Sequence, residues 1–110
     1  QAVPQHRIKS DKMENILSLL AEEFGKYKTI ERAALFGSRA RGDFNERSDY
    51  DIAVFGDVIG ADKARLRAWT EEELPTLHKI DLTFVGDVSD EKFLESIERE
   101  GIIFYDKAGK

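Results

Sequence analysis

The stretch that decides the fold of this chain is residues 37–51, GSRARGDFNERSDYD. It joins a Gly-Ser turn, Gly37 and Ser38, to an Asp-x-Asp pair, Asp49 and Asp51, through a spacer of ten residues. The turn offers backbone N–H groups, a hydroxyl and two arginines, and the pair offers two carboxylates. This order of groups predicts a phosphate-binding turn followed by a site for a divalent cation.

The carboxylates are expected to act as a group. Side chains alternate faces along a strand, so Asp49 and Asp51 should lie on one face, about 6.5–7 Å apart, where they repel each other unless a cation lies between them. A third carboxylate, Asp81, stands in an apolar strand predicted over residues 79–85, where a charge is costly without a partner. If the two strands are neighbours, the three side chains could hold two metal ions roughly 3.5–4 Å apart. Asp81 would then be placed to accept the proton of an attacking hydroxyl.

The turn itself is suited to anions. Gly37 permits a close approach of the backbone to a phosphate, and Ser38 is expected to begin a short helix whose N-terminal N–H groups attract negative charge. Arg39 and Arg41 carry planar guanidinium groups that can bind phosphate oxygens. Taken singly, these features have ordinary interpretations as a turn, a solvated strand edge, a salt-bridged residue or surface charges. Their order along the chain favours a phosphate and metal site.

Composition limits the class of protein. A length of 110 residues with 41% apolar and 35% charged residues describes one soluble globular domain. The absence of cysteine excludes disulfides and thiolate metal sites and fits a cytoplasmic location. No apolar run approaches the length of a membrane-spanning helix. The net charge of −5 argues against nucleic-acid binding by bulk electrostatics, although residues 1–41 carry a net charge of +3 and residues 42–110 one of −8.

The hydrophobic pattern predicts helices alternating with strands, which indicates an α/β domain. The expected helices are one from Met13 to Phe24, capped by Ser10 or Asp11 and stopped at Gly25, then residues 38–41, residues 62–74 and a last helix capped by Ser89. The expected strands are residues 30–36, 49–55, 79–85 and 102–105. His6 and His78 are interpreted as structural or surface residues, Trp69 as core and Glu71 to Glu73 as a solvated helix end. The pattern leaves open whether the sheet is mixed or fully parallel.

The motif resembles a minimal nucleotidyltransferase (MNT) domain of the DNA polymerase β-like superfamily, whose signature is Gly-Ser, a spacer, Asp-x-Asp and a later third carboxylate. The resemblance covers residues 11–106 and leaves residues 1–10 as a flexible N-terminal segment and residues 107–110 as a C-terminal tail. It implies a mixed β-sheet flanked by helices, with the site at one end of the sheet. It also implies Mg²⁺-dependent transfer of a nucleoside monophosphate, usually AMP from ATP, with release of pyrophosphate.

The resemblance also implies a role for each residue of the motif. Asp49 and Asp51 would be metal ligands, Asp81 the third carboxylate and candidate general base, Gly37 and Ser38 the residues that hold the triphosphate, and Arg39 and Arg41 phosphate contacts, with Arg41 the weaker of the two.

The chain offers no recognisable acceptor pocket. It resembles the MntA-type antitoxin half of HEPN–MNT modules, in which a separate helical HEPN ribonuclease toxin is bound and AMP-modified on a tyrosine. We therefore expect a protein adenylyltransferase that acts as an antitoxin in a hetero-oligomer. Two alternatives stay open: a nucleotidyltransferase of small molecules such as aminoglycosides, and a non-catalytic antitoxin that neutralises its partner by binding. A DxD glycosyltransferase is disfavoured because that chemistry normally needs a larger fold.

Overall fold

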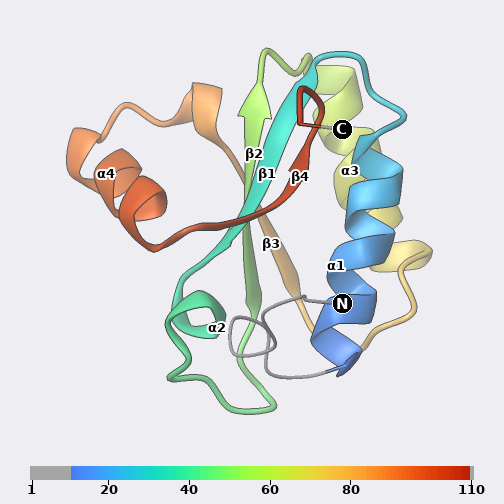
Figure 1. The fold of residues 1–110 in the computed structure, drawn as a ribbon. Helices are drawn as coiled ribbons and strands as arrows, with labels where there is room; N and C mark the ends of the chain where they lie inside the picture. Colours follow the sequence, from blue (N-terminus) through green and yellow to red (C-terminus); the bar gives the residue numbers. More distant parts are fainter. Residues whose placement is uncertain (1–10, 110) are drawn as a thin grey trace.

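Helices and strands alternate along residues 11–109, the part of the chain that the computed structural model describes (Figure 1). The elements are α1 (Asp11–Phe24), β1 (Ile30–Phe36), α2 (Ser38–Arg41), β2 (Tyr50–Gly56), α3 (Gly60–Glu72), β3 (Ile80–Phe84), a 3₁₀ turn η1 (Val85–Asp87), α4 (Glu91–Glu100) and β4 (Ile102–Asp106). The predictions for residues 1–10, which include His6 and a cap at Ser10, lie outside the described residues. No described helix is long and apolar enough to cross a membrane.

The four strands form one mixed sheet in the order β3-β2-β1-β4. Strand β1 runs antiparallel to both β2 and β4, whereas β2 and β3 are parallel. The parallel pair requires a crossover, which α3 supplies. Helices α1 and α3 cover one face of the sheet and α4 lies on the other (Figure 1). The expected mixed sheet flanked by helices is therefore confirmed, and the question that the pattern left open is answered.

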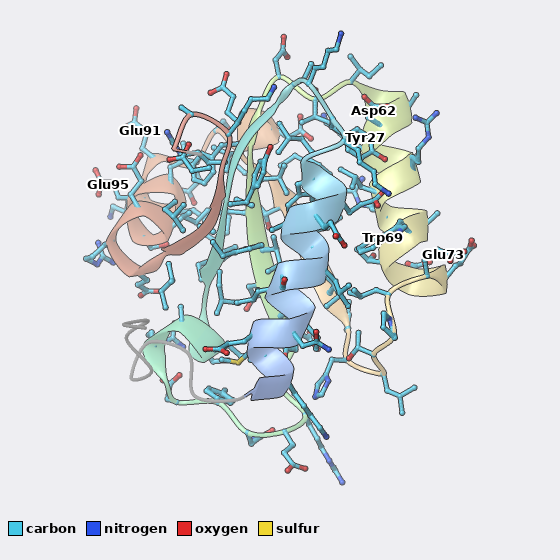
Figure 2. The ribbon with its side chains drawn as sticks, turned by 45° about the vertical axis from the view of Figure 1, so that its right-hand side comes forward. Tyr27, Asp62, Trp69, Glu73, Glu91 and Glu95 are labelled. Atoms are coloured by element: carbon cyan, nitrogen blue, oxygen red, sulfur yellow. The ribbon has the colours of Figure 1, made fainter. Side chains whose placement is uncertain are left out.

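Alternation along β2 divides its side chains between the two faces. Tyr50, Ile52 and Val54 belong to the large buried cluster that also holds the apolar side of α1, as the spacing of that helix predicts. Ala53 belongs to a second buried cluster, with Phe36 of β1 and Ile97 of α4. Asp51, which lies between Tyr50 and Ile52 in sequence, therefore faces the α4 side of the sheet. Trp69 packs against the large cluster from α3, as expected (Figure 2).

Several predicted boundaries differ from the structure. The second strand begins at Tyr50 rather than Asp49, because the amide of Tyr50 donates to the carbonyl of Lys79 and starts the parallel pairing. The third helix ends before residue 74, since the amides of Glu73 and Leu74 both return to the carbonyl of Trp69.

The predicted cap of the last helix is also wrong by one residue. Asp90, not Ser89, caps α4, and its Oδ1 accepts hydrogen bonds from the amides of Lys92 and Phe93 at 3.0 and 3.3 Å. A carboxylate at this position also complements the helix dipole, which a hydroxyl does less well.

Candidate active site

Asp51 and Asp81 occupy directly paired positions on the parallel strands β2 and β3. Paired residues of neighbouring strands lie on the same face, about 4.8 Å apart along the hydrogen-bonding direction. Both carboxylates therefore stand on the α4 side of the sheet. Asp49 precedes β2 by one residue and acts electrostatically on Asp51. The sequence predicts that Asp81 joins Asp49 and Asp51 if the two strands are neighbours, and in the structure they are.

The electrostatics of this group are unfavourable to negative charge. Burial raises the pKa of Asp51, and the charges of Asp81 and Asp49 raise it further, whereas Arg41 and Lys79 act in the opposite direction. The sequence-based prediction of the site did not include Lys79, although this residue stands two positions before Asp81 and strand alternation places both on one face. The positive charges of Lys79 and Arg41 only partly offset the repulsion among the three carboxylates. A divalent cation beside Asp51 would remove that repulsion.

The sequence suggests that the charge of Asp81 needs a partner because its strand is apolar, but the structure shows a different environment. Asp81 is an exposed residue of an edge strand, so its charge is not forced into an apolar environment. Asp49 is exposed as well, and Asp51 is half-buried. Among residues 11–109, no three His, Cys, Asp or Glu side chains lie close enough together to hold a metal ion. The three carboxylates thus meet at one end of the sheet without converging on a point, as expected for like charges.

Gly37 connects β1 to α2 directly beside Asp51. Its φ of 77° and ψ of −156° lie in a region that residues with a side chain rarely adopt. A Cβ at this position would collide with Oδ2 of Asp51 and lie 3.1 Å from its Cγ. In the structure, the close approach that this glycine permits is to the Asp51 carboxylate, and the approach to a phosphate stays a prediction.

Helix α2 is a single turn of four residues. Ser38 begins it, the carbonyl of Gly37 accepts hydrogen bonds from the amides of Ala40 and Arg41, and Gly42 ends it in the left-handed conformation with φ 95°. Because the helix is so short, its dipole is small. Binding of an anion at this turn would therefore rely on individual amide and hydroxyl donors. Ser38 is half-buried. It stands two residues after Phe36, the residue of β1 that pairs with Asp51. Its hydroxyl therefore belongs to the same end of the sheet as the carboxylates.

Arg41 is tied to the end of α4. Its Nε lies 3.3 Å from Oδ2 of Asp43, and its Nη1 lies 3.3 Å from Oε1 of Glu100. Its positive charge lowers the pKa of Asp51, so it lies within the field of the carboxylates. Glu100 is a further residue that the sequence analysis missed, since 59 positions separate it from Arg41 and no local pattern links them.

Arg39 lies away from the carboxylates. Its side chain is only 4% exposed, and its guanidinium carbon lies 4.1 Å from the ring centroid of Tyr50. Tyr50 faces the large cluster on the α1 side, whereas the adjacent Asp51 faces α4. This placement does not support the predicted phosphate contact of Arg39, because the guanidinium lies on the opposite face of β2 from Asp51. His78 is structural, as expected, and its ring meets that of Tyr50 edge-on at 5.5 Å.

Comparison with known proteins gives the class of this domain. Residues 18–110 match a family model described as "Polymerase beta, Nucleotidyltransferase". The chain therefore belongs to this nucleotidyltransferase family.

More specific similarities cover different parts of the chain. A segment of 34 residues is 56% identical to the "Putative protein adenylyltransferase MJ0604" of Methanocaldococcus jannaschii, and this alignment spans 30% of the present chain and 34% of that protein. A chain from the crystal structure of a toxin–antitoxin with AMP-PNP has a TM-score of 0.65 at 20% identity, with 87% of the present chain and 75% of that chain covered. A chain from a mutant form of the toxin–antitoxin pair MntA–HpeT has a TM-score of 0.61 at 17% identity, with coverage of 90% and 74%. At these identities the two structures establish a shared fold.

Proposed function

We propose that this nucleotidyltransferase transfers AMP from ATP to a hydroxyl group of a partner protein, and that the modification neutralises a toxin. The observation that carries the proposal is the pairing of Asp51 with Asp81 at an open end of the sheet, next to the Gly-Ser turn. Two similarities support the choice of a protein acceptor: the 34-residue match to a putative protein adenylyltransferase, and the fold shared with chains of toxin–antitoxin structures. A tyrosine of a helical HEPN toxin is the specific acceptor that we propose.

The donor set of the site fits Mg²⁺. Asp49, Asp51 and Asp81 would offer carboxylate oxygens, which Mg²⁺ prefers as ligands. Burial and the charges of Asp81 and Asp49 raise the pKa of Asp51, and a cation at this position would favour its charged form. Bound there, Mg²⁺ ions would neutralise the developing charge on the phosphate oxygens. Gly37 and Ser38 would bind the triphosphate from the side of the turn, and Arg41 would offer its guanidinium to the phosphates from the end of α2.

The chemical step proposed for these residues is a single displacement. The hydroxyl oxygen of the acceptor attacks the α-phosphorus of ATP, and its proton passes to the carboxylate of Asp81. The bond between the α-phosphorus and the oxygen that bridges to the β-phosphorus breaks, and pyrophosphate leaves with that electron pair. Asp81 is exposed, so a hydroxyl on another molecule can reach it.

The acceptor is proposed to arrive on a macromolecule because the carboxylates are open to solvent. Asp49 and Asp81 are exposed, and the cavity of about 600 Å³ between α1 and the segment before β3 is lined by other residues. Its lining consists of Lys12, Asn15, Ile16 and residues 74–78. An open carboxylate group favours a partner surface over an enclosed small molecule.

The direct test is to incubate the chain with labelled ATP, Mg²⁺ and the product of the neighbouring gene. Transfer of label to that protein is expected, with loss of transfer in Asp51→Asn and in the pair Asp49→Ala/Asp51→Ala. Asp57→Asn is the matched control, because Asp57 follows β2 at its other end and is exposed.

The two alternatives give different results in the same experiment. A non-catalytic antitoxin would neutralise its partner equally well with Asp51→Asn, and no label would be transferred. A small-molecule nucleotidyltransferase would label a compound such as an aminoglycoside and leave the protein unlabelled. Absence of transfer to any protein partner would overturn the proposal.

A further inference from the structure

Arg39 is a buried cation whose charge is satisfied by backbone carbonyls. Its Nε and Nη2 lie 3.1 and 3.0 Å from the carbonyl oxygen of Ser48, and Nη2 also lies 3.4 Å from that of Asn45 and 3.5 Å from that of Glu46. Its Nη1 contacts Sδ of Met13 in α1 at 3.4 Å. A cation that is 4% exposed is expensive to bury, and hydrogen bonds to several acceptors offset that cost. The three carbonyl acceptors all belong to the loop that leads into Asp49.

Two aromatic rings hold the guanidinium in place. The guanidinium carbon lies 4.1 Å from the ring centroid of Tyr50 and 4.8 Å from that of Phe44. Tyr50 is the first residue of β2 and is 1% exposed, and Phe44 packs against the same buried cluster from within the loop. Cation–π contacts of this kind are strongest where water is excluded. Arg39 thus joins the loop to the core of the domain.

His78 is a second attachment of the same loop. The ring nitrogen Nε2 of His78 hydrogen-bonds to the carbonyl of Glu46, and Nδ1 lies 3.2 Å from Oγ1 of Thr76. The loop also has internal hydrogen bonds, from the amide of Asn45 to Oγ of Ser48 at 3.1 Å and from the amide of Ser48 back to the carbonyl of Asn45 at 3.1 Å. A surface loop with this many attachments has a defined shape.

We propose that Arg39 is a positioning residue that fixes the loop of residues 43–49, so that Asp49 is delivered beside Asp51. Two donors of Arg39 converge on the carbonyl of Ser48, which belongs to the peptide group that precedes Asp49. The peptide bond is planar and trans, so fixing that carbonyl fixes the direction in which the chain enters Asp49. On the other side of Asp49, the amide of Tyr50 is bonded to the carbonyl of Lys79 at 3.0 Å. Asp49 is therefore anchored on both sides while its own side chain is exposed.

This role differs measurably from that of a phosphate ligand. A side chain that contacts the triphosphate contributes to the binding of ATP whether or not a metal ion is present. A side chain that positions Asp49 acts through the metal ion, so its loss should raise the Mg²⁺ concentration needed for ATP binding. Loss of residues that orient metal ligands typically reduces metal affinity or activity about 10–100-fold. The inference about the metal ion rests on the proposed role of Asp49 as a ligand.

The test compares Arg39→Met and Arg39→Lys with Arg47→Met. Arg47 lies in the same loop and is exposed, so Arg47→Met removes the same charge without touching the buried contacts. Hydrogen–deuterium exchange of residues 43–49 is measured without metal or nucleotide, and binding of a non-hydrolysable ATP analogue is measured against Mg²⁺ concentration. We expect Arg39→Met to accelerate exchange in the loop about tenfold or more and to raise the half-saturating Mg²⁺ concentration about 10–100-fold. Arg39→Lys should show smaller changes, since it keeps the charge but loses the planar fork, and Arg47→Met should resemble the unchanged protein.

The outcomes separate this proposal from the proposed function. Unchanged loop exchange in both Arg39 variants would overturn the positioning role, whatever the protein modifies. Faster exchange with an unchanged Mg²⁺ requirement would show that Arg39 fixes the loop, and would overturn the proposal that it positions Asp49 for metal binding. Weaker binding of the ATP analogue in the presence of EDTA, with normal exchange, would show that Arg39 is a phosphate ligand instead. If Arg39→Met fails to fold, Arg39→Lys carries the comparison, because it preserves the buried charge.

Discussion

Gly37 and Asp51 are packed so closely that no side chain fits between them. A Cβ on Gly37 would overlap Oδ2 of Asp51, and its φ of 77° is strained for any residue with a side chain. Gly37→Ala must therefore either displace the Asp51 carboxylate or twist the turn. We expect a loss of about 1–3 kcal/mol in the free energy of unfolding, together with a loss of nucleotidyl transfer of tenfold or more.

The measurements for Gly37→Ala are urea unfolding and transfer of label from ATP. Gly60→Ala is the matched control, because a Cβ at Gly60 meets no atom within 4 Å and the residue begins α3. Alanine favours a helix, so this control should leave activity unchanged and stability equal or slightly higher. Full activity in Gly37→Ala would show that the turn does not need the observed conformation.

Ionisation of Asp51 is expected to make the metal-free protein less stable. Burial and the charges of Asp81 and Asp49 raise the pKa of Asp51 above its ordinary value of 3.8. A carboxyl group whose pKa is higher in the folded than in the unfolded state binds more protons when folded. The free energy of unfolding therefore falls as the pH rises between the two pKa values, and stays lowered at higher pH.

Asp51→Asn is expected to raise Tm at pH 7 in metal-free buffer, and the gain should shrink as the pH falls toward 3.8. Thermal unfolding over a pH series measures this effect. Asp57→Asn removes a charge from the exposed residue that follows β2 and should show no such trend. Mg²⁺ should stabilise the unchanged protein more than Asp51→Asn, because only the former keeps the whole set of carboxylates. A lower Tm for Asp51→Asn at pH 7 would contradict the unfavourable burial of this charge.

The cap of α4 offers a test that is independent of the active site. Oδ1 of Asp90 accepts two backbone hydrogen bonds at the start of the helix, so Asp90→Ala should lower the free energy of unfolding by about 1 kcal/mol. Ser89→Ala should change it by much less, although the sequence favours Ser89 as the cap. Chemical denaturation of the two variants side by side decides between the residues. Equal losses would mean that both side chains contribute to the start of the helix.

The sequence predicts those parts of the site that depend on local spacing. Strand alternation places Asp51 away from the core residues Tyr50 and Ile52. The pairing of Asp81 with Asp51 does not follow from the sequence, which left open whether the two strands are neighbours, and only the structure shows it. The helical spacing from Met13 to Phe24 likewise predicts the buried side of α1. Such features follow from periods of two and 3.6 residues, which a sequence displays directly.

The remaining features depend on contacts between distant segments. Arg39 and Arg41 stand two residues apart in one short helix, yet Arg39 is buried against Tyr50 whereas Arg41 reaches Glu100. Nothing in the local pattern distinguishes the two arginines, because the difference arises from what packs around α2 in the folded chain. The same reason explains why a buried role for Arg39 is absent from the sequence-based expectations: arginine is rarely buried without a carboxylate.

The ion pair between Arg41 and Glu100 is expected to restrain a residue that we propose as a phosphate contact. Glu100 Oε1 lies 3.3 Å from Nη1 of Arg41, so it competes with a bound triphosphate for the same guanidinium. Such partly exposed pairs contribute only about 0.2–1 kcal/mol, so Glu100→Gln should alter stability little and strengthen ATP binding at most about fivefold. Isothermal titration with a non-hydrolysable ATP analogue measures the change. Glu98→Gln on the exposed side of α4 removes an equal charge without touching Arg41 and should leave binding unchanged. Weaker binding in Glu100→Gln alone would mean that Glu100 holds Arg41 in its working position and does not compete for it.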